Sequence, residues 1–233
     1  MPPISALPNH SILVVVTSHA ALGSTGRDTG YYLSEVAHPH RVFSDAGYVM
    51  DYASPNGALA PMDKSSFDLS DPVISSFWRG PGERALANTI PLRHVRPELY
   101  SAVFFAGGHG TMWDFNGNKD IAKIARSIFE RGGVVAAVCH GPAALVDVQL
   151  SDGSYLVGGR EVTSFTNAEE TAAQLHEIVP FALETALRDR GARFVEGGLW
   201  QNNVAGRGTQ LITGQNPMSA VSTAEAVVEK LRK

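Results

Sequence analysis

Residues 134–145 of the chain read VVAAVCHGPAAL, and this stretch decides the fold. Its first five residues are an apolar, valine-rich run of the kind that forms a strand buried on both faces of a parallel sheet. Cys139, His140, Gly141 and Pro142 follow directly, and small residues with a proline favour a tight turn into a helix. The sequence therefore predicts a strand, a sharp turn that carries Cys139, and a helix.

The same alternation extends outward along the rest of the chain. Strands are predicted at residues 12–16, 47–52, 101–106, 133–138, 192–195 and 210–213, and helices at 31–46, 82–88, 120–131, 181–190 and 220–231. Residues 155–163 are interpreted as a hairpin or edge region, 54–71 as a long loop insertion, and 197–208 as a loop with a short turn. This order predicts an α/β fold with a doubly wound, mostly parallel sheet flanked by helices. No linker divides the chain, so we expect residues 1–233 to form a single domain.

The composition excludes several classes of protein. A chain of 233 residues that is 44% hydrophobic and 18% charged is globular rather than disordered or coiled-coil. Its net charge of −4 argues against a nucleic-acid binder. The first ten residues, MPPISALPNH, lack the positively charged region of a signal peptide, and the apolar run 12–16 is too short for its apolar region or for a membrane span, so we expect no targeting segment. The single cysteine excludes an internal disulfide or a multi-thiolate zinc site, and we expect a cytosolic protein whose thiol stays reduced.

The predicted turn places Cys139 where a catalytic nucleophile would stand. A nucleophile on a strained strand-to-helix turn lies above the carboxyl edge of the sheet, where ligands collect. The N-terminus of the following helix would stabilise a thiolate and lower the pKa of the thiol, and the backbone N–H groups after it would bind an oxyanion. A buried structural cysteine is the alternative. The position between strand and helix, with His140 beside it, favours the nucleophile.

A second apolar run, ending in Gly107, Gly108 and His109, supports a site at the same edge. If the two strands are neighbours, the amides of Gly107 and Gly108 would complete the oxyanion hole. Phosphate binding is the competing interpretation of this glycine-rich turn, but no Gly-Lys-Ser/Thr follows it. His109 is interpreted either as a wall of the pocket or as a helix-start residue.

The histidines and the tryptophans indicate less about the function. The eight histidines show no paired spacing such as H-E-x-x-H, so we expect no metal site. Trp78, Trp113 and Trp200 are interpreted as core or interface residues, although each could line a pocket.

Taken together, these segments resemble the ThiJ/PfpI superfamily, which has the class I glutamine-amidotransferase-like fold, and more narrowly its glutathione-independent glyoxalase III, heat-shock-type group. The matching stretches are residues 29–39, 106–111, 132–142, 164–171 and 211–220, in the family's order. The resemblance implies that Cys139 is the nucleophile, His140 its acid/base, and Glu170 the acid that orients His140, with Glu169 one residue away as the alternative. It also implies that Glu35 lies against the sulfur, where burial would raise its pKa and keep it protonated.

The resemblance implies an enzyme without a cofactor. The activity would be that of a glyoxalase III-type lyase (D-lactate dehydratase type), which converts methylglyoxal and related 2-oxoaldehydes to D-lactate or the corresponding 2-hydroxy acid through a cysteine hemithioacetal. The resemblance further implies a cytoplasmic homodimer of the stress response, with a small-molecule 2-oxoaldehyde as its partner and neither nucleic acid nor a membrane.

Two other functions stay open at this point. One is a stress-response chaperone, protein deglycase or redox-sensing protein, which aggregation suppression surviving Cys139→Ala would support. The other is a cysteine hydrolase or amidotransferase-like enzyme, which ammonia release from glutamine would support.

Overall fold

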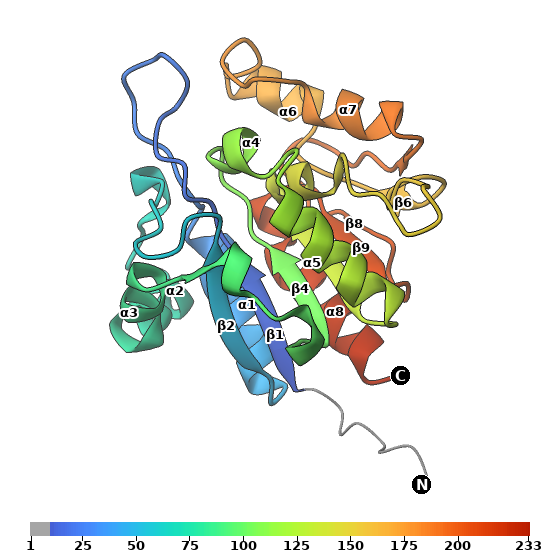
Figure 1. The fold of residues 1–233 in the computed structure, drawn as a ribbon. Helices are drawn as coiled ribbons and strands as arrows, with labels where there is room; N and C mark the ends of the chain where they lie inside the picture. Colours follow the sequence, from blue (N-terminus) through green and yellow to red (C-terminus); the bar gives the residue numbers. More distant parts are fainter. Residues whose placement is uncertain (1–9) are drawn as a thin grey trace, which may run out of the picture.

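A central β-sheet organises the computed structural model, which describes residues 10–233 (Figure 1). The strands are β1 (Ser11–Val15), β2 (Val49–Ser54), β3 (Ile90–Pro91), β4 (Ala102–Phe105), β5 (Val134–Val138), β6 (Glu161–Val162), β7 (Arg193–Phe194), β8 (Val204–Ala205) and β9 (Leu211–Gly214). Seven of them form one sheet in the order β3-β2-β1-β4-β5-β9-β8. All neighbours in it are parallel except β8 and β9, and β6 and β7 form a separate parallel pair.

Helices surround this sheet. They are α1 (Ser34–Asp45), α2 (Pro72–Phe77), α3 (Glu83–Ala87), α4 (Thr111–Asp114), α5 (Lys119–Glu130), α6 (Asn167–Ala172), α7 (Leu183–Asp189) and α8 (Ala220–Leu231). A π-helical turn, Trp78–Gly82, joins α2 to α3, and 3-10 turns lie at Lys64–Ser66, Leu92–His94, Pro97–Leu99, Gly141–Leu145 and Pro217–Ser219. None of the helices within residues 10–233 is long and apolar enough to cross a bilayer.

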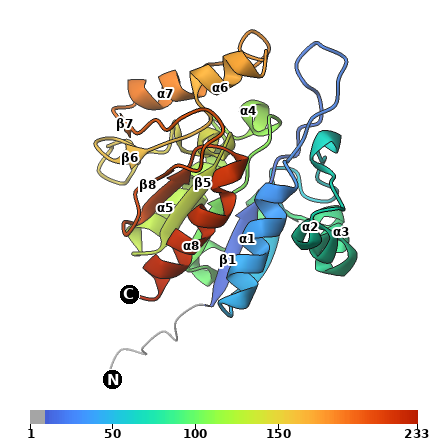
Figure 2. The same cartoon turned by 180° about the vertical axis from the view of Figure 1, so that it is seen from behind.

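The sheet is buried on both faces, as its apolar strands require. Ile12 and Val14 of β1 pack in the cluster that contains residues of α1 and α8, whereas Leu13 and Val15 pack in the cluster that contains residues of α5. This alternation follows from the two-residue period of a strand. Figure 2 shows α1 and α8 together on one side of the sheet, and Figure 1 shows α5 on the other. The structure thus confirms the predicted doubly wound, mostly parallel α/β fold.

Most expected elements are found at the predicted places. Residues 12–16, 47–52, 101–106 and 133–138 correspond to β1, β2, β4 and β5, each within two residues of its predicted start. The buried positions of α5 are those with helical spacing in the sequence: Ile121, Ile124, Ala125 and Ile128. The closing helix has the predicted bounds, Ala220–Leu231.

Three local predictions are wrong. Residues 155–163 form no hairpin, because β6 pairs in parallel with β7, about thirty residues later in the chain. The expected loop at 197–208 contains β8, whose two residues are too few to leave a pattern in the sequence. The segment after Cys139 is a five-residue 3-10 turn, Gly141–Leu145, instead of an α-helix.

The expected loop at residues 54–71 contains only one short 3-10 turn after the end of β2, and it packs beside the start of α1. The N–H of Tyr31 donates to the carbonyl of Pro61 at 2.9 Å, and the N–H of Asp63 donates to the carbonyl of Tyr31 at 2.9 Å. The hydroxyl of Ser66 accepts from the N–H of Leu33 at 2.9 Å. These bonds hold the residues that lead into α1, and therefore the position of Glu35.

Gly141 is the residue at which the fold leaves no room for a side chain. A Cβ atom there would collide with the carbonyl oxygen of Phe105, the last residue of β4. We expect Gly141→Ala to lower the free energy of unfolding by about 1–3 kcal/mol, because β4 and β5 must separate to admit the methyl group. Urea denaturation measures this change. Gly158→Ala, whose Cβ would meet nothing closer than 3.1 Å, is the control with the smaller expected effect. Equal losses in the two variants would contradict the prediction.

Candidate active site

Three segments that are distant in the sequence meet at the carboxyl edge of the sheet. The segment after β1 leads to Glu35 in the first turn of α1, β4 ends just before Gly107, and β5 ends just before Cys139. Because β1, β4 and β5 are parallel neighbours, they deliver these residues to one edge, where the strand order reverses and ligands usually bind.

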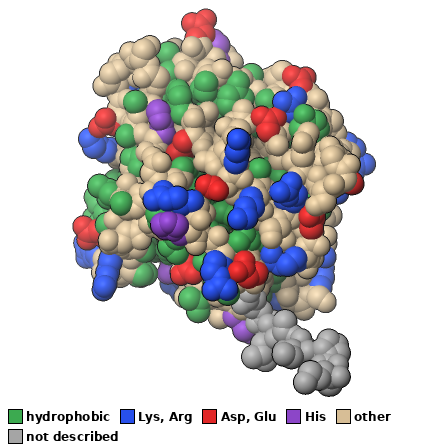
Figure 3. Space-filling view, in the orientation of Figure 1, with side chains coloured by type: hydrophobic (Ala, Val, Ile, Leu, Met, Phe, Trp, Pro, Cys, Tyr) green, Lys and Arg blue, Asp and Glu red, His purple; other side chains and the backbone are tan. Residues whose placement is uncertain are grey.

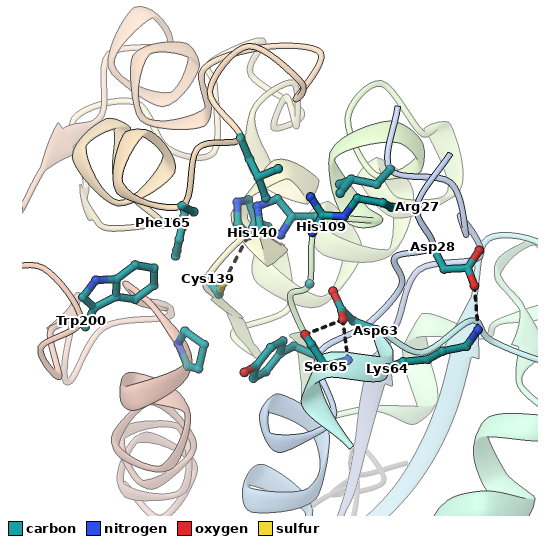
Figure 4. Close-up of a pocket in the computed structure, with 16 residues that line it drawn as sticks. Arg27, Asp28, Asp63, Lys64, Ser65, His109, Cys139, His140, Phe165 and Trp200 are labelled. Carbon is teal, nitrogen blue, oxygen red and sulfur yellow. Dashed lines mark hydrogen bonds and ion pairs between the residues drawn. The ribbon is translucent and has the colours of Figure 1, made fainter. Parts of the chain in front are cut away.

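A cavity of about 530 Å³ opens at this edge, and Gly108, His109, Cys139 and His140 line it (Figure 4). Its volume lies in the usual range of small-molecule sites.

The cavity has two different walls (Figure 4). Phe165 and Trp200 stand on one side, and Arg27, Asp28 and Lys64 stand on the other. Lys64 and Asp28 form an exposed ion pair at 2.7 Å, which contributes little to stability but keeps both side chains at the rim.

Cys139 occupies the strained turn that the sequence predicts. Its φ of 60° lies in the left-handed region, which costs a non-glycine residue on the order of 1–3 kcal/mol. Two backbone hydrogen bonds hold this turn: the Cys139 N–H donates to Gly214 at 2.9 Å, and the Cys139 carbonyl accepts from Phe165 at 2.8 Å. The side chain is 4% exposed and lies at the inner end of the cavity.

The electrostatics of the thiol differ from the prediction. Burial raises the pKa of Cys139, and a charged Glu35 raises it further, whereas the N–H groups of Gly108 and His140 lower it. A 3-10 turn of five residues follows the sulfur where an α-helix was expected, so two individual N–H groups replace the helix N-terminus as the source of stabilisation. The expected lowering of the pKa is therefore wrong, because burial outweighs the two N–H groups and raises the pKa of the thiol above its usual value.

Glu35 is fully buried, and its carboxyl group interacts with the thiol of Cys139. Burial raises the pKa of Glu35 to about 8, against the opposing hydrogen bonds of Cys139 and the Gly107 N–H. Glu35 is then neutral at pH 7, where its charge no longer opposes a thiolate and its O–H can donate to the sulfur. Cys139 and Glu35 consequently titrate as one coupled pair.

One of the two glycine amides expected in the oxyanion hole is already engaged. The N–H of Gly107 donates to Oε2 of Glu35 at 2.8 Å, so it is not free for a substrate oxygen. The N–H of Gly108 instead faces the sulfur, as does that of His140. Gly108 has a φ of 100°, and a Cβ there would collide with the backbone of Gly30 and Tyr32. The prediction for Gly107 is thus corrected, and Gly108 and His140 are the available donors.

His140 joins the sulfur to a carboxylate. Its Nδ1 lies 3.3 Å from Sγ of Cys139, and its Nε2 lies 2.7 Å from Oε2 of Glu170. An ionised carboxylate only accepts hydrogen bonds, so Nε2 carries the hydrogen and Nδ1 is free to accept the thiol proton. Burial lowers the pKa of His140, and the charge of His109 lowers it further. The irregular backbone at Cys139 therefore lets two consecutive residues face each other.

His109 has the same carboxylate as a partner. Its Nε2 lies 2.8 Å from Oε1 of Glu170, and its ring centroid lies 4.0 Å from that of His140. Of the two interpretations of His109, the cavity wall is the one that the structure shows. Burial would raise the pKa of Glu170, but His140 and His109 together hold it far below its usual range.

The structure distinguishes Glu169 from Glu170. Oε1 of Glu169 accepts from the Trp200 N–H at 2.9 Å, from Gln215 at 3.1 Å and from Asn216 at 2.8 Å. Its Oε2 accepts from the N–H of Thr166 at 3.0 Å within a capping box. Glu169 is therefore a buried structural anchor, and Glu170 is the residue that reaches the histidines.

Trp200 is the wall residue that the sequence analysis misjudged. It is 47% exposed and lines the cavity instead of packing in the core. Its ring centroid lies 5.4 Å from that of Phe165, which in turn lies 4.4 Å from that of His140. Phe165 falls in the stretch 164–171 that matches the family, which was the available signal for it.

The sequence showed no paired histidine spacing, yet the fold assembles three possible metal ligands. One ligand atom each of His109, His140 and Glu170 lies within 4.8 Å of the others. In the structure Nε2 of each histidine is hydrogen-bonded to an oxygen of Glu170. A cation would have to displace the hydrogens of both Nε2 atoms, so the arrangement fits proton transfer better than metal binding.

Comparisons with known proteins agree with this geometry. The sequence profile of the DJ-1/PfpI family matches residues 28–230. "Glyoxalase 3" of Candida albicans is 32% identical over 93% of this chain and 96% of its own length. "Glutathione-independent glyoxalase hsp3101" of Schizosaccharomyces pombe is 30% identical over 95% of this chain and 97% of its own. Rapid Encystment Protein 24 KDa of Francisella tularensis has a crystal structure that superposes with a TM-score of 0.91 at 37% identity, over 95% of this chain and 98% of that one. The predicted resemblance is confirmed.

The raised pKa of Glu35 predicts how stability depends on pH. An ordinary Glu ionises near 4.5, whereas Glu35 in the folded protein ionises near 8, so between these values the folded state holds one more proton. The free energy of unfolding therefore falls as pH rises through this window, by up to about 1.4 kcal/mol per pH unit from this group. Urea denaturation at pH 5 and pH 8 measures the fall.

Glu35→Gln is the matched control for this pH dependence, because it keeps a neutral hydrogen-bond donor. Burial raises the pKa of Asp114 to about 6, so this residue also makes the free energy of unfolding fall as pH rises. It does so in the parent protein and in Glu35→Gln alike. The difference between the two slopes therefore reports the coupled titration of Glu35 and Cys139, and equal slopes would contradict an ionisation of Glu35 near pH 8.

The anchoring role of Glu169 gives a second prediction. Glu169→Gln places an amide NH₂ among groups that are themselves donors, so we expect the free energy of unfolding to drop by about 1.5–3 kcal/mol. Glu177→Gln, at an exposed position, should change it by less than about 0.5 kcal/mol. Urea denaturation compares the two, and a Glu169→Gln protein as stable as the Glu177→Gln protein would disprove the anchor.

Proposed function

We propose, from the premise that this chain belongs to the DJ-1/PfpI family, that it is a glutathione-independent glyoxalase of the glyoxalase III type. It would convert methylglyoxal or a related 2-oxoaldehyde, with water, to D-lactate or the corresponding 2-hydroxy acid. Two relatives of nearly equal length carry glyoxalase names, which supports this assignment. The observation that carries it is the placement of His140 and Glu35 against one sulfur, that of Cys139.

The first step is addition of the thiol to the aldehyde. Nδ1 of His140, 3.3 Å from the sulfur, takes the thiol proton, and the sulfur of Cys139 bonds to the aldehyde carbon. The N–H groups of Gly108 and His140, which face the sulfur, stabilise the negative charge that forms on the aldehyde oxygen. The proton held by His140 then neutralises that oxygen, which yields a hemithioacetal.

The second step moves hydrogen between adjacent carbons. His140, which is neutral again, removes the proton from the former aldehyde carbon and returns it to the neighbouring carbon through an enediol, while Glu35 stays protonated beside the sulfur. The product is a thioester of Cys139 with the 2-hydroxy acid. Water hydrolyses this thioester and restores the thiol. Glu170 acts here as a positioning residue, because it fixes the tautomer of His140 from 2.7 Å.

All groups needed for this sequence are side chains and amides of the chain, so the proposed reaction uses neither glutathione nor a metal. The enzyme is accordingly classed as a cysteine-dependent lyase. We place it in the cytoplasm, as a homodimer with a role in the stress response and with no nucleic-acid or membrane partner. The net charge of −4 supports the absence of a nucleic-acid partner, and on the face shown in Figure 3 Lys and Arg side chains lie interspersed with Asp and Glu.

Activity without glutathione is the direct test. Purified protein incubated with methylglyoxal alone should form lactate, and a chiral assay should find the D isomer. Cys139→Ala should lower kcat by at least about a thousandfold, because no other residue can form the thioester. Its melting temperature shows whether the variant remains folded. Lactate formation that persists in Cys139→Ala, or that needs added glutathione, would refute the assignment, and ammonia release from glutamine would favour a hydrolase.

A further inference from the structure

One carboxylate in this site holds two imidazoles. Glu170 accepts from Nε2 of His140 through one oxygen and from Nε2 of His109 through the other, at 2.7 and 2.8 Å. A single histidine oriented by a single acid would suffice to activate the sulfur. The second imidazole lines the same cavity, and the mechanism above gives it no task.

We propose that His109 is a second acid–base residue, which moves a proton between the two oxygens of the bound substrate while His140 moves a proton between its two carbons. This inference rests on the proposed glyoxalase activity and deepens it. It gives separate chemical roles to the two histidines that share Glu170.

The reaction requires one proton transfer between the two carbons and another between the two oxygens. When the former aldehyde carbon loses its proton, the electron pair of that C–H bond forms the C=C bond of the enediol. The π electrons of the neighbouring ketone then move to the ketone oxygen, which must gain a proton. When the second carbon is protonated, the hydroxyl of the first carbon must lose its proton to become the thioester carbonyl. The two oxygens of a cis-enediol are adjacent, so one imidazole can serve both.

The position of His109 suits the outer oxygen. Nδ1 of His140 lies 3.3 Å from the sulfur, so His140 is next to the carbon that bonds to Cys139. The ketone oxygen lies farther from the sulfur, and His109 is the next imidazole along the cavity, with ring centroids 4.0 Å apart. Because Nε2 of His109 is committed to Glu170, Nδ1 is the atom left for the substrate.

The environments of the two histidines assign the acid and the base. The side chain of His140 is 1% exposed and that of His109 is 17% exposed. Burial and the charge of His109 lower the pKa of His140, so the more deeply buried His140 is suited to act as the base and the more exposed His109 is left as the acid. The charged groups around this pair are Glu170 and, farther off, Glu169 from α6, and Arg27 from the opposite wall of the cavity (Figure 4).

The steps balance without another reactant. Protonated His109 gives its Nδ1 proton to the ketone oxygen as His140 takes the proton from carbon. His140 then gives that proton to the second carbon, and neutral His109 takes the hydroxyl proton from the first. The bound substrate has become the thioester of a 2-hydroxy acid, and both histidines have returned to their starting states.

His109→Gln tests this inference, because the amide nitrogen of Gln can still donate to Glu170 while the acid–base function is lost. We expect kcat for methylglyoxal to fall about a hundredfold or more, with KM within about threefold of the parent. The primary isotope effect on kcat with substrate deuterated at the aldehyde carbon should rise, because C–H cleavage becomes slower. Alkylation of Cys139 by iodoacetamide should stay within about threefold of the parent rate, since His140 keeps its contacts with the sulfur and with Glu170. His176→Gln, at an exposed histidine, is the matched control and should keep full activity.

The outcomes separate this inference from the proposed function. A parent protein that forms no lactate refutes the glyoxalase itself. An active parent whose His109→Gln variant keeps kcat within threefold and an unchanged isotope effect overturns the role of His109 alone, as does a variant that loses alkylation and activity together. If His109→Gln is unstable, His109→Ala decides the question: recovery of activity with added imidazole supports the acid–base role, and no recovery overturns it.

Discussion

The left-handed backbone at Cys139 is the constraint on which the rest of the site depends. A φ of 60° is unfavourable for a residue with a side chain, and it persists because both neighbours of β5 hold the turn in place. Gly141 lies so close to β4 that a methyl group would not fit, and the Cys139 N–H is bonded to the end of β9. This geometry turns the sulfur toward α1 and lets His140 face it, which a regular helix would forbid.

Burial then decides how protons are distributed around that sulfur. Glu35 is fully enclosed, so it stays neutral at physiological pH and acts as a donor instead of a competing charge. Glu170 is held in the opposite state by two imidazoles. Two carboxyl groups of the same chemical type therefore play opposite parts, one as an acid and one as an anion, because their neighbours differ. Glu35 interacts with the sulfur of Cys139, and Glu170 is hydrogen-bonded to the two histidines.

A helix or strand could be predicted from the sequence where its own residues carry the pattern that defines it. β5 and α5 were evident because every residue of one is apolar and the other repeats its buried positions at helical spacing. The pairing of β6 was not evident because its partner lies about thirty residues later in the chain, and β8 was not evident because two residues are too few to leave a pattern. The choice between Glu169 and Glu170 had the same difficulty. Adjacent residues on a short helix point in different directions, and only the fold shows that one meets Trp200 and the other meets the histidines.

The sequence by itself determined the doubly wound sheet, the turn that carries Cys139 and the family to which the chain belongs. These features depend on the periodicity of apolar residues, on turn residues and on motifs of consecutive residues, and all three can be observed in the amino-acid sequence. Only the tertiary structure decided that Gly107 is engaged by Glu35, that His109 shares Glu170 with His140, and that Trp200 walls the cavity. Each of these depends on distances between residues that are tens of positions apart, and on burial, which no local pattern encodes.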